Sequence, residues 1–293
     1  MAGRLDGRTL FMSGGSRGIG LAIAKAAAAE GANVAIAAKT AEPHPKLPGT
    51  IFTAAEEIEA AGGRALPLVC DIRDETAVAE AVDKAAARFG GVDIVVNNAS
   101  AIQLTGTEQT DIRRYDLMNG INARGTFVVT KSCLSHLLKS EHARVLTLSP
   151  PLDLAPQWLR GHVAYSLAKF SMSILSIGWA AEFQGRIGVN CLWPRTTIDT
   201  AAVRNLLGGD EMAARSRRPE IMADAAIAIL LKPVSFSGWC CLDDLVLAAE
   251  GVTDFGRYAV TPGGPLQPDF FVPGSAPPPH AAMGQVGWRA PIL

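Results

Sequence analysis

Residues 8–20 read RTLFMSGGSRGIG, and this stretch decides the fold. Its apolar first half predicts a buried strand over Arg8–Met12, and the alanine-rich sequence that follows predicts a helix after a glycine turn. Gly14, Gly18 and Gly20 have the spacing G-x-x-x-G-x-G. Glycines would let the backbone turn sharply and approach a diphosphate, which the N-terminus of the helix would face. A plain strand-to-helix turn is the alternative, but the flanking strand and helix favour a dinucleotide site.

Short apolar runs alternate with longer helical runs along the rest of the chain. Strands are expected at Arg8–Met12, Asn33–Ala38, Ala65–Cys70, Val92–Val96, Ala143–Leu148, Arg186–Leu192 and Trp239–Leu242. Helices are expected at Ile19–Ala29, Ile51–Ala61, Glu75–Phe89, Ile112–Leu138, Ala164–Phe183 and Glu220–Leu231. Apolar strands that alternate with helices predict a parallel sheet covered on both faces. We therefore expect a Rossmann-like, doubly wound α/β fold, with a seven-stranded parallel sheet flanked by helices in a single domain over residues 1–261.

Residues 262–293 have a different composition, with eight prolines and few charged side chains. Such a segment cannot continue a helix or a central strand. Two interpretations remain open. It is either a mobile tail, or a tail laid over the core or a neighbouring subunit and anchored by Phe270, Phe271 or Trp288.

Charge, cysteine spacing and the distribution of apolar residues argue against a nucleic-acid-binding protein, a metal site and a membrane span. The 293 residues include 27 Lys and Arg against 28 Asp and Glu, a formal net charge of −1, whereas nucleic-acid-binding proteins normally carry a basic excess. The five cysteines show no metal-ligand spacing, which predicts no metal site and a reduced setting. The most apolar stretch, Leu21–Ala38, is broken by Lys25 and Glu30, so we expect no membrane span and no signal peptide. A cytoplasmic protein is the expectation.

The end of the second expected strand distinguishes NAD from NADP. A carboxylate there would accept the ribose 2′-hydroxyl of NAD, whereas a cation suits the 2′-phosphate of NADP. Here Ala38 is followed by Lys39, the glycine turn contributes Arg17, and no carboxylate appears before Glu42. NADP is therefore the expected cofactor and NAD the less favoured one, although both cations could simply be solvated.

Two further strand ends fit a nucleotide site. Asp71, at the end of the third expected strand, could accept a hydrogen bond from the adenine amino group. Asn98 and Ala99 end the fourth strand, at the carboxyl edge where open α/β sheets bind ligands. The paired asparagines before Ala99 could equally be simple turn residues.

Tyr165 and Lys169 stand four residues apart, on one face of an expected helix whose stripe Leu167, Phe170, Ile174 and Ile177 is expected to face the core. Such pairs are common by chance, but this helix follows the strand after the asparagine-rich turn. A free phenol has a pKa of about 10, and an ammonium at about 4 Å could bring it to about 7. Tyr165 could then exchange a proton with a substrate hydroxyl or carbonyl.

These motifs, in this order over residues 1–250, resemble the short-chain dehydrogenases/reductases. The matching residues are Gly14, Gly18, Gly20, Asp71, Asn97–Ala99, Asn122, Tyr165 and Lys169. The resemblance implies Tyr165 as general acid/base, Lys169 as ribose anchor and modifier of the tyrosine pKa, and Asn122 as a proton-relay residue acting through water. The expected cofactor contacts are Gly14, Ser16, Arg17, Gly18, Ile19, Gly20, Lys39, Asp71, Asn98, Ala99, Lys169, Pro194 and Thr196. It also implies a homodimer or homotetramer, and it leaves a peroxisomal or mitochondrial location open.

The sequence departs from the family pattern at two places. The family usually has a catalytic serine 13 residues before the tyrosine, where this chain has Leu152. Ser149 is expected to take that role, if the two prolines after it lengthen the loop. The usual Pro-Gly after the sixth strand is Pro194-Arg195 here, and residues 196–200 are expected to close over the nicotinamide.

Substrate signals are few. Trp158 and Trp193 would flank the pocket mouth on this fold, and aromatic walls suit a lipid-like or acyl substrate, but both could equally be core or interface residues. The expected activity is an NADP-dependent oxidoreductase that interconverts a hydroxyl and a carbonyl on an apolar, lipid-like or acyl substrate. An NADP-binding regulatory protein with weak or no turnover, and an enoyl-thioester reductase on the same fold, are the alternatives. Animal members of one subgroup of this family carry a following sterol-carrier domain, which this chain is expected to lack.

Overall fold

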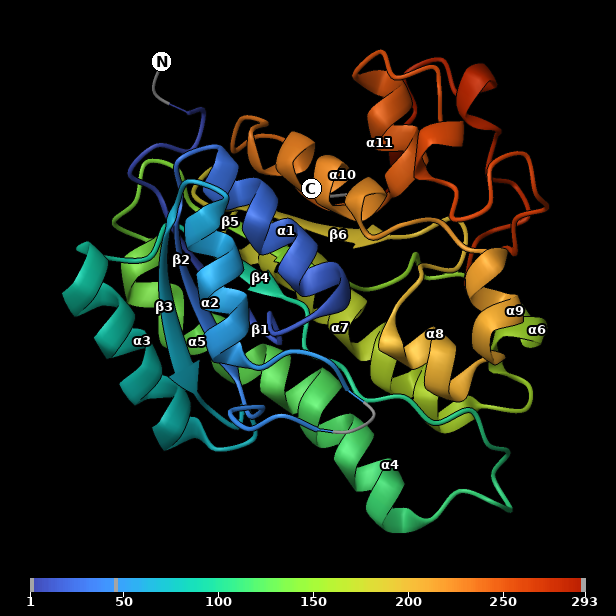
Figure 1. Ribbon diagram of the computed structural model, residues 1–293, viewed down its shortest axis with the longest axis horizontal. Helices are drawn as coiled ribbons and strands as arrows, with labels where there is room; N and C mark the ends of the chain where they lie inside the picture. Colours follow the sequence, from blue (N-terminus) through green and yellow to red (C-terminus); the bar gives the residue numbers. More distant parts are fainter. Residues whose placement is uncertain (1–2, 45–46, 291–293) are drawn as a thin grey trace.

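A twisted sheet with helices on both faces forms the centre of the molecule (Figure 1). The computed structural model describes residues 3–44 and 47–290. The strands are β1 Thr9–Ser13, β2 Asn33–Ala38, β3 Arg64–Val69, β4 Ile94–Asn97, β5 Arg144–Thr147, β6 Gly188–Trp193, β7 Trp239–Leu242 and β8 Gly287–Arg289. Their order across the sheet is β3-β2-β1-β4-β5-β6-β7-β8. The order reverses at β1, which is where doubly wound sheets bind their ligands.

The sheet has eight strands rather than the seven expected from the sequence. Neighbours from β3 to β7 are parallel, and β8 pairs with β7 in the antiparallel sense. The eighth strand comes from the proline-rich segment and has three residues. A run that short carries no periodic pattern, so it could not be predicted from the sequence.

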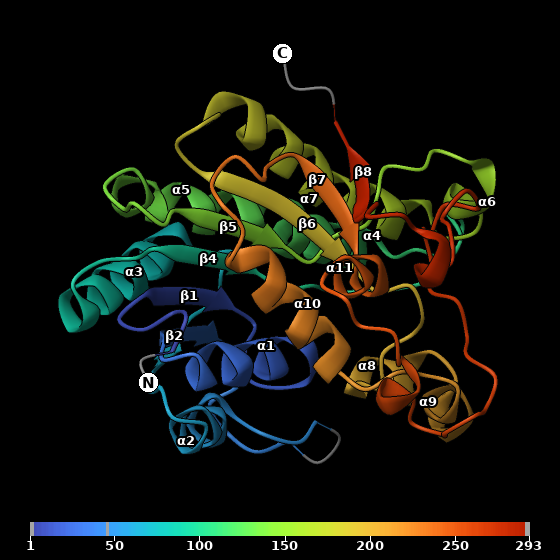
Figure 2. The ribbon, with the colours of Figure 1, turned by 90° about the horizontal axis from the view of Figure 1, so that it is seen from above.

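Helices cover both faces of the sheet, as Figure 2 shows from above. The α-helices are α1 Gly18–Ala29, α2 Ile51–Ala60, α3 Glu75–Phe89, α4 Ile112–Met118, α5 Thr126–Leu137, α6 Pro156–Leu159, α7 Val163–Glu182, α8 Ala201–Leu206, α9 Gly209–Ala214, α10 Glu220–Leu230 and α11 Asp243–Ala249. Three shorter elements are the π-helix η1 Asn119–Gly125 and the 3₁₀ turns η2 Gly256–Tyr258 and η3 Pro279–Ala281. The long helix expected over Ile112–Leu138 is thus α4 and α5 with a π-helical turn between them.

Alternate residues of each strand enter two separate cores. In β1, Leu10 and Met12 pack with α1, α2 and α10, whereas Phe11 packs on the opposite face with α3 and α5. All five residues of β1 are buried. Burial on both faces explains why the strands have continuous apolar sequences.

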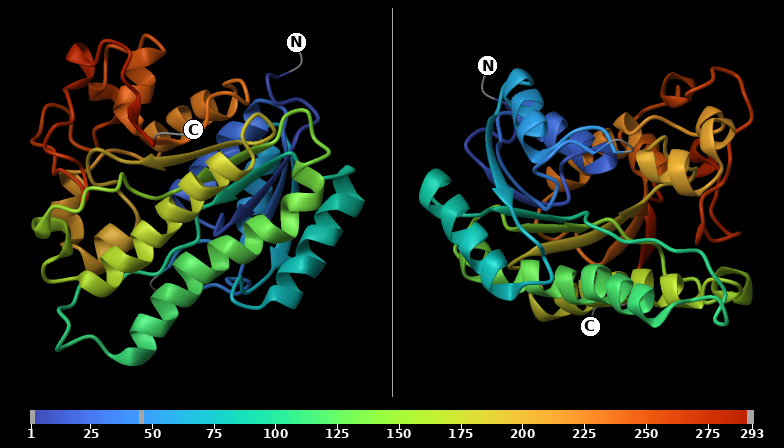
Figure 3. Two further views of the ribbon diagram at one scale, coloured as in Figure 1. Left: turned by 180° about the vertical axis from the view of Figure 1, so that it is seen from behind. Right: turned by 60° about the horizontal axis from the view of Figure 1, so that its bottom comes forward.

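The proline-rich segment lies on the core, which is the second of the two interpretations open from the sequence. Trp288 in β8 is paired with Cys240 in β7, and the side chain of Phe271 is completely buried. Figure 3 shows this C-terminal part on the same side of the molecule as α8 and α9. Phe271 belongs to a third apolar cluster that also contains Tyr165 and Trp193.

Within the described residues, none of the helices has the length and apolar character that a membrane crossing requires. The same part of the chain contains no group of three or more His, Cys, Asp and Glu side chains that could hold a metal ion.

Candidate active site

The glycine turn between β1 and α1 packs too closely for other residues. Gly14 has a φ of +76° and Gly18 a φ of +56°, in the left-handed region that favours glycine. A Cβ on Gly14 would lie 2.8 Å from the Cα of Ala99, and one on Gly20 would lie 2.5 Å from Nδ2 of Asn98. That Nδ2 donates to the carbonyl oxygen of Gly14 at 2.7 Å. The ends of β1 and β4 are therefore fastened together at the turn.

A cavity of about 700 Å³, the dinucleotide cavity, lies over this turn and the N-terminus of α1. Ten of the expected cofactor contacts line it: Gly14, Ser16, Arg17, Gly18, Ile19, Gly20, Lys39, Asp71, Asn98 and Ala99. The first turn of α1 contains no acidic side chain, so its free N–H groups can face an anion. The size and the donor groups of this cavity fit a nicotinamide dinucleotide.

Cations dominate one end of the dinucleotide cavity. Nζ of Lys39 lies 3.1 Å from Oδ2 of Asp71, and the same carboxylate accepts from Nε of Arg73 at 3.0 Å. The Arg73 guanidinium first, and Lys39 to a smaller degree, hold the pKa of Asp71 well below its usual range. Arg17 donates to the carbonyl oxygens of Pro48–Gly49. The sequence reasoning missed Arg73, although it stands two residues after Asp71.

A second cavity of about 200 Å³, the tyrosine cavity, adjoins the first. Both are lined by Ile19, Asn98, Ser100, Ile102, Thr200 and Ala202. Tyr165 and Lys169 are one turn apart on α7. They line the tyrosine cavity but not the dinucleotide cavity. Nζ of Lys169 donates to the carbonyl oxygen of Leu148 at 2.7 Å and lies 5.0 Å from the ring centroid of Trp193. The Tyr165 hydroxyl makes no hydrogen bond with any other described residue, so it is free to meet a substrate oxygen.

The pKa of Tyr165 does not follow the expectation from the sequence. Burial raises the pKa of Tyr165, and the charge of Asp269 raises it further. Burial also lowers the pKa of Lys169 to about 7. The ammonium is directed at the Leu148 carbonyl and is itself desolvated, so it does not overcome the burial of the phenol. Tyr165 therefore keeps its proton at neutral pH.

Ser149 does not line the tyrosine cavity, although its neighbour Leu148 does. Its side chain is completely buried beside the Cys191 thiol, and its hydroxyl has no hydrogen-bond partner among the described residues. Ser149 lies two residues after the end of β5, and Pro150 and Pro151 follow it directly. The catalytic role expected of Ser149 beside Tyr165 therefore stays a prediction.

Asn122 lies at the centre of the π-helix and is completely buried. Its Oδ1 accepts from the backbone N–H of Ala101 at 2.8 Å, and its Nδ2 donates to the carbonyl oxygen of Ala101 at 3.1 Å. The side chain lines neither cavity. It fastens the segment after β4, which carries Ser100 and Ile102 of both cavity walls.

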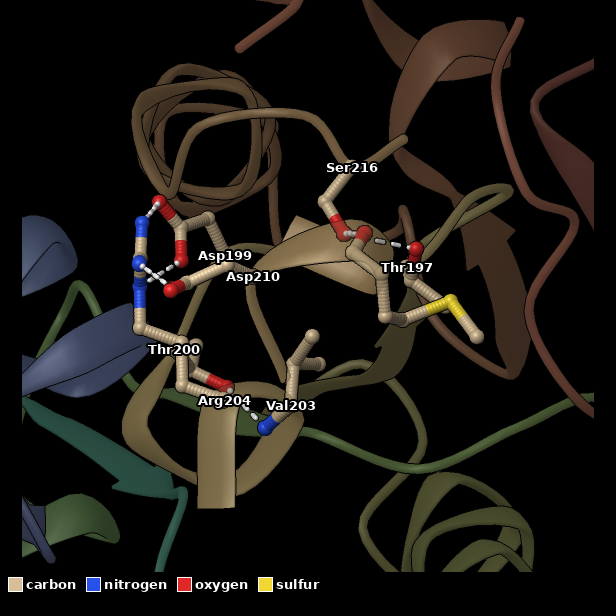
Figure 4. Close-up of polar contacts among 8 residues, drawn as sticks. Thr197, Asp199, Thr200, Val203, Arg204, Asp210 and Ser216 are labelled. Carbon is tan, nitrogen blue, oxygen red and sulfur yellow. Dashed lines mark hydrogen bonds and ion pairs between the residues drawn. The ribbon is translucent and has the colours of Figure 1, made fainter. Parts of the chain in front are cut away.

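The loop after β6 contributes Pro194 and Thr200 rather than Thr196. Pro194 lines the tyrosine cavity and Thr200 lines both cavities, whereas Oγ1 of Thr196 is buried without a partner among the described residues. Figure 4 shows Thr200 at the start of α8, where its hydroxyl accepts from the N–H of Val203, and Arg204 paired with Asp199. The path of this irregular loop places Thr200, and not Thr196, at the cavity wall, and that path cannot be predicted from the sequence.

The C-terminal segment supplies a wall of the tyrosine cavity that the sequence did not predict. Asp269 and Phe270 line it, and the ring of Phe271 lies 6.0 Å from that of Tyr165. The backbone holds this wall in place, because the N–H of Asp269 donates to the carbonyl oxygen of Arg195 at 3.0 Å. Trp193 donates through Nε1 to the carbonyl oxygen of Phe270.

A third cavity of about 440 Å³, the apolar side cavity, lies beyond this wall. Its walls include Leu104, Trp158 and Met212. Asp269 and Phe270 line both it and the tyrosine cavity. Of the two tryptophans expected at the pocket mouth, Trp193 lines the tyrosine cavity and Trp158 the apolar side cavity.

The outer face of α7 is partly apolar. Leu167 and Ile174, which were expected to face the core, are 48% and 59% exposed. Phe170 is buried as expected, because it packs against Phe271. Phe127 on α5 is also exposed, and its ring lies 6.2 Å from that of Trp179 on α7 in a tilted arrangement. The prediction for Leu167 and Ile174 was wrong because a solvent-facing apolar stripe has the same spacing as a core stripe.

Comparison with known proteins gives a consistent assignment. The family model described as short chain dehydrogenase matches residues 8–209. Hydroxysteroid dehydrogenase-like protein 2 of Danio rerio is 58% identical over 272 residues, which are 93% of this chain and 65% of that protein. The human protein of the same name is 54% identical over 270 residues, which are 92% of this chain and 64% of that protein. The chain thus spans slightly less than two thirds of these relatives' length.

Solved structures agree with the sequence relatives. The crystal structure of a short chain dehydrogenase from Mycobacterium thermoresistibile superposes with a TM-score of 0.89 at 55% identity, covering 94% of this chain and 99% of that one. The resemblance inferred from the motifs is therefore confirmed, and the chain is similar in particular to hydroxysteroid dehydrogenase-like protein 2. This chain belongs to the short-chain dehydrogenase/reductase family of oxidoreductases.

Proposed function

We propose that this protein is an NADP-dependent oxidoreductase that interconverts a hydroxyl and a carbonyl group on an apolar, lipid-like or acyl substrate. One observation carries the proposal, namely the junction of the two cavities. Tyr165 and Lys169 face the tyrosine cavity, and this cavity continues into the dinucleotide cavity through walls that both share. A substrate oxygen at Tyr165 would therefore lie next to a nicotinamide placed at the junction.

The charges in the dinucleotide cavity support NADP. Lys39 and Arg17 line it, whereas the carboxylate that lines it, Asp71, is already bonded to Arg73. A 2′-phosphate would thus meet two cations and a compensated acid, while the 2′-hydroxyl of NAD would find no free carboxylate in Asp71.

The protonated phenol supports Tyr165 as the general acid in the reduction of a carbonyl. When bound, the nicotinamide supplies the hydride. Tyr165, whose pKa is raised by burial, would donate its proton to the carbonyl oxygen. Lys169 would turn from the Leu148 carbonyl to the ribose hydroxyls and replace the lost tyrosine proton. Asn122 would act as a positioning residue through Ala101.

The cavity walls support an apolar substrate. Apart from the ionisable groups and a few small polar residues, the tyrosine cavity is walled by aliphatic and aromatic side chains, and the apolar side cavity extends it. Together they offer room for a chain beyond the reacting carbon.

The test replaces the phenol. NADPH oxidation would be followed by absorbance with a panel of medium-chain ketones and 3-oxoacyl esters, for the native protein and Tyr165→Phe. We expect a loss of kcat of about 100-fold or more, since a general acid contributes roughly 10²–10⁴, with NADPH affinity retained. Tyr258→Phe is the matched control, because its hydroxyl bonds Asp224 outside both cavities.

Three outcomes separate the candidates. Turnover that survives Tyr165→Phe would refute the role given to the tyrosine. NADPH binding without turnover on any carbonyl would favour a regulatory protein, which the absence of Ser149 from the cavity makes a real alternative. Product analysis that found a saturated acyl chain from an enoyl thioester would favour carbon–carbon double-bond reduction.

We also propose a homodimer or homotetramer that buries the outer faces of α5 and α7. The exposure of Phe127, Leu167 and Ile174 supports it, because apolar side chains gathered on one surface favour association. Light scattering at micromolar concentration should give a mass of two or four chains, and Ile174→Lys should lower it.

A further inference from the structure

Among the described residues that line the tyrosine cavity, Asp269 is the one acid. Its Oδ1 accepts from the N–H of Phe270 at 2.6 Å, and its own N–H is bonded to Arg195. Oδ2 makes no hydrogen bond with the described residues, and no ion pair within 4.0 Å joins Asp269 to Lys169 in this part of the chain. The carboxylate is thus held in place and keeps one oxygen free for a ligand.

Ionisation of Asp269 in this desolvated position is energetically unfavourable. Burial raises the pKa of Asp269 to about 7, and the hydrogen bond from Phe270 and the charge of Lys169 only partly offset it. The charged and titratable groups that face it are Lys169 and Tyr165 on α7. A half-buried acid without a close cation contributes little to stability, and such groups are often functional.

Asp269 also stands where two cavities meet. It lines both the tyrosine cavity and the apolar side cavity, as do Phe270 and Leu207. A substrate whose reacting oxygen met Tyr165 and whose acyl group pointed toward the apolar side cavity would pass Asp269. The acyl group would then lie beside the Asp269 carboxylate.

We propose that Asp269 selects the substrate by charge, so that the protein accepts acyl esters, thioesters or amides and excludes the corresponding free acids. The inference rests on the proposed function and names its substrate class. A substrate carboxylate would face the Asp269 carboxylate in a site poorly screened by water. A neutral acyl derivative has no such repulsion, and an amide N–H would find a free acceptor in Oδ2.

The test compares two substrates that differ in one charge. The full chain with NADP⁺ would oxidise methyl 3-hydroxyoctanoate or 3-hydroxyoctanoate at about pH 8.5, where Asp269 is ionised. We expect the native protein to prefer the ester by at least about tenfold in kcat/KM. Asp269→Asn should raise kcat/KM for the acid, so that the ratio falls to within about threefold of one. Asp210→Asn removes an acid that is 93% exposed and lies outside both cavities, and it should leave the ratio unchanged.

Binding gives a readout that does not depend on turnover. Trp158 and Trp193 line the two cavities, so quenching of tryptophan fluorescence in the NADPH complex reports binding of either compound. Asp269→Ser is a second variant, since its hydroxyl can still accept from Phe270 if the amide variant folds poorly. Discrimination in binding that is lost in these variants supports charge selection even if Tyr165 proves not to be catalytic. Equal binding of ester and acid to the native protein, binding of neither, or discrimination that persists in both variants would overturn the proposal.

Discussion

Loss of the Arg195 guanidinium should loosen the C-terminal wall of the active site. Nε of Arg195 lies 2.5 Å from Oδ2 of Asp244, and its Nη2 donates to the carbonyl oxygen of Pro277 at 2.8 Å. Asp244 is completely buried, and the Arg195 side chain is 18% exposed. One guanidinium thus joins α11 to the segment that follows it.

The expected cost can be worked from these contacts. Removing one partner of a buried ion pair costs about 3–5 kcal/mol, because the remaining charge has no partner. Arg217, whose Nη1 is 3.5 Å from the same Oδ2, would keep part of the attraction. We therefore expect Arg195→Met to lower the free energy of unfolding by about 3 kcal/mol and Tm by about 6 °C.

Calorimetry at neutral pH and hydrogen exchange over residues 262–290 would measure the two effects. Faster exchange should be concentrated in that segment. Arg204→Met is the matched control, because Arg204 is also paired with two carboxylates, Asp199 and Asp210, but at the surface. Exposed pairs contribute little, so its Tm should hardly change. Equal shifts for the two variants, or unchanged exchange in the segment, would refute the reasoning.

Three further changes should each act on a different part of the molecule. Gly14→Ala places a Cβ 2.8 Å from the backbone of Ala99 at a φ of +76°, so it should weaken NADPH binding by more than about tenfold in calorimetric titration, and unchanged affinity would contradict the close packing. Lys39→Ala should weaken NADPH by about fivefold to tenfold and leave NADH unaffected, and a parallel loss for both would argue against a 2′-phosphate contact. Burial first, and the charge of Asp244 second, raise the pKa of Asp243 to about 7. Because the unfolded carboxyl titrates at about 4, the folded state binds the extra proton and stability falls as pH rises between about 4 and 7. Asp243→Asn should flatten that decline in urea unfolding at several pH values, and an unaltered slope would show that another group causes it.

Local patterns were enough to predict most of the fold. β1 and β2 are buried on both faces, and such strands are continuous apolar runs that can be recognised in isolation. β8 could not be recognised, because Gly287–Arg289 is ordered by pairing with β7 and not by a pattern of its own. The π-helical turn inside the expected long helix, where Asn122 bonds Ala101, was missed as well.

The candidate site divides in the same way. Gly14 belongs to a short glycine motif, and Tyr165 and Lys169 are one turn apart on a single helix. The spacing within these local motifs was enough to predict where the residues lie. Asp269 reaches the cavity from a segment 100 residues after Lys169, and no local pattern indicates it. The role expected of Ser149 stays a prediction, because this residue is completely buried and does not line the tyrosine cavity.

The wall formed by Asp269, Phe270 and Phe271 has a consequence for the order in which the protein matures on the ribosome. Among the described residues, every one that lines the dinucleotide cavity lies between Gly14 and Leu206, whereas the substrate side is closed by residues made more than 60 positions later. The residues that face the nucleotide are therefore all synthesised before the wall that encloses a substrate. A proteolytic cut between β7 and Asp269 would separate this wall from the part of the chain that carries every described lining residue of the dinucleotide cavity.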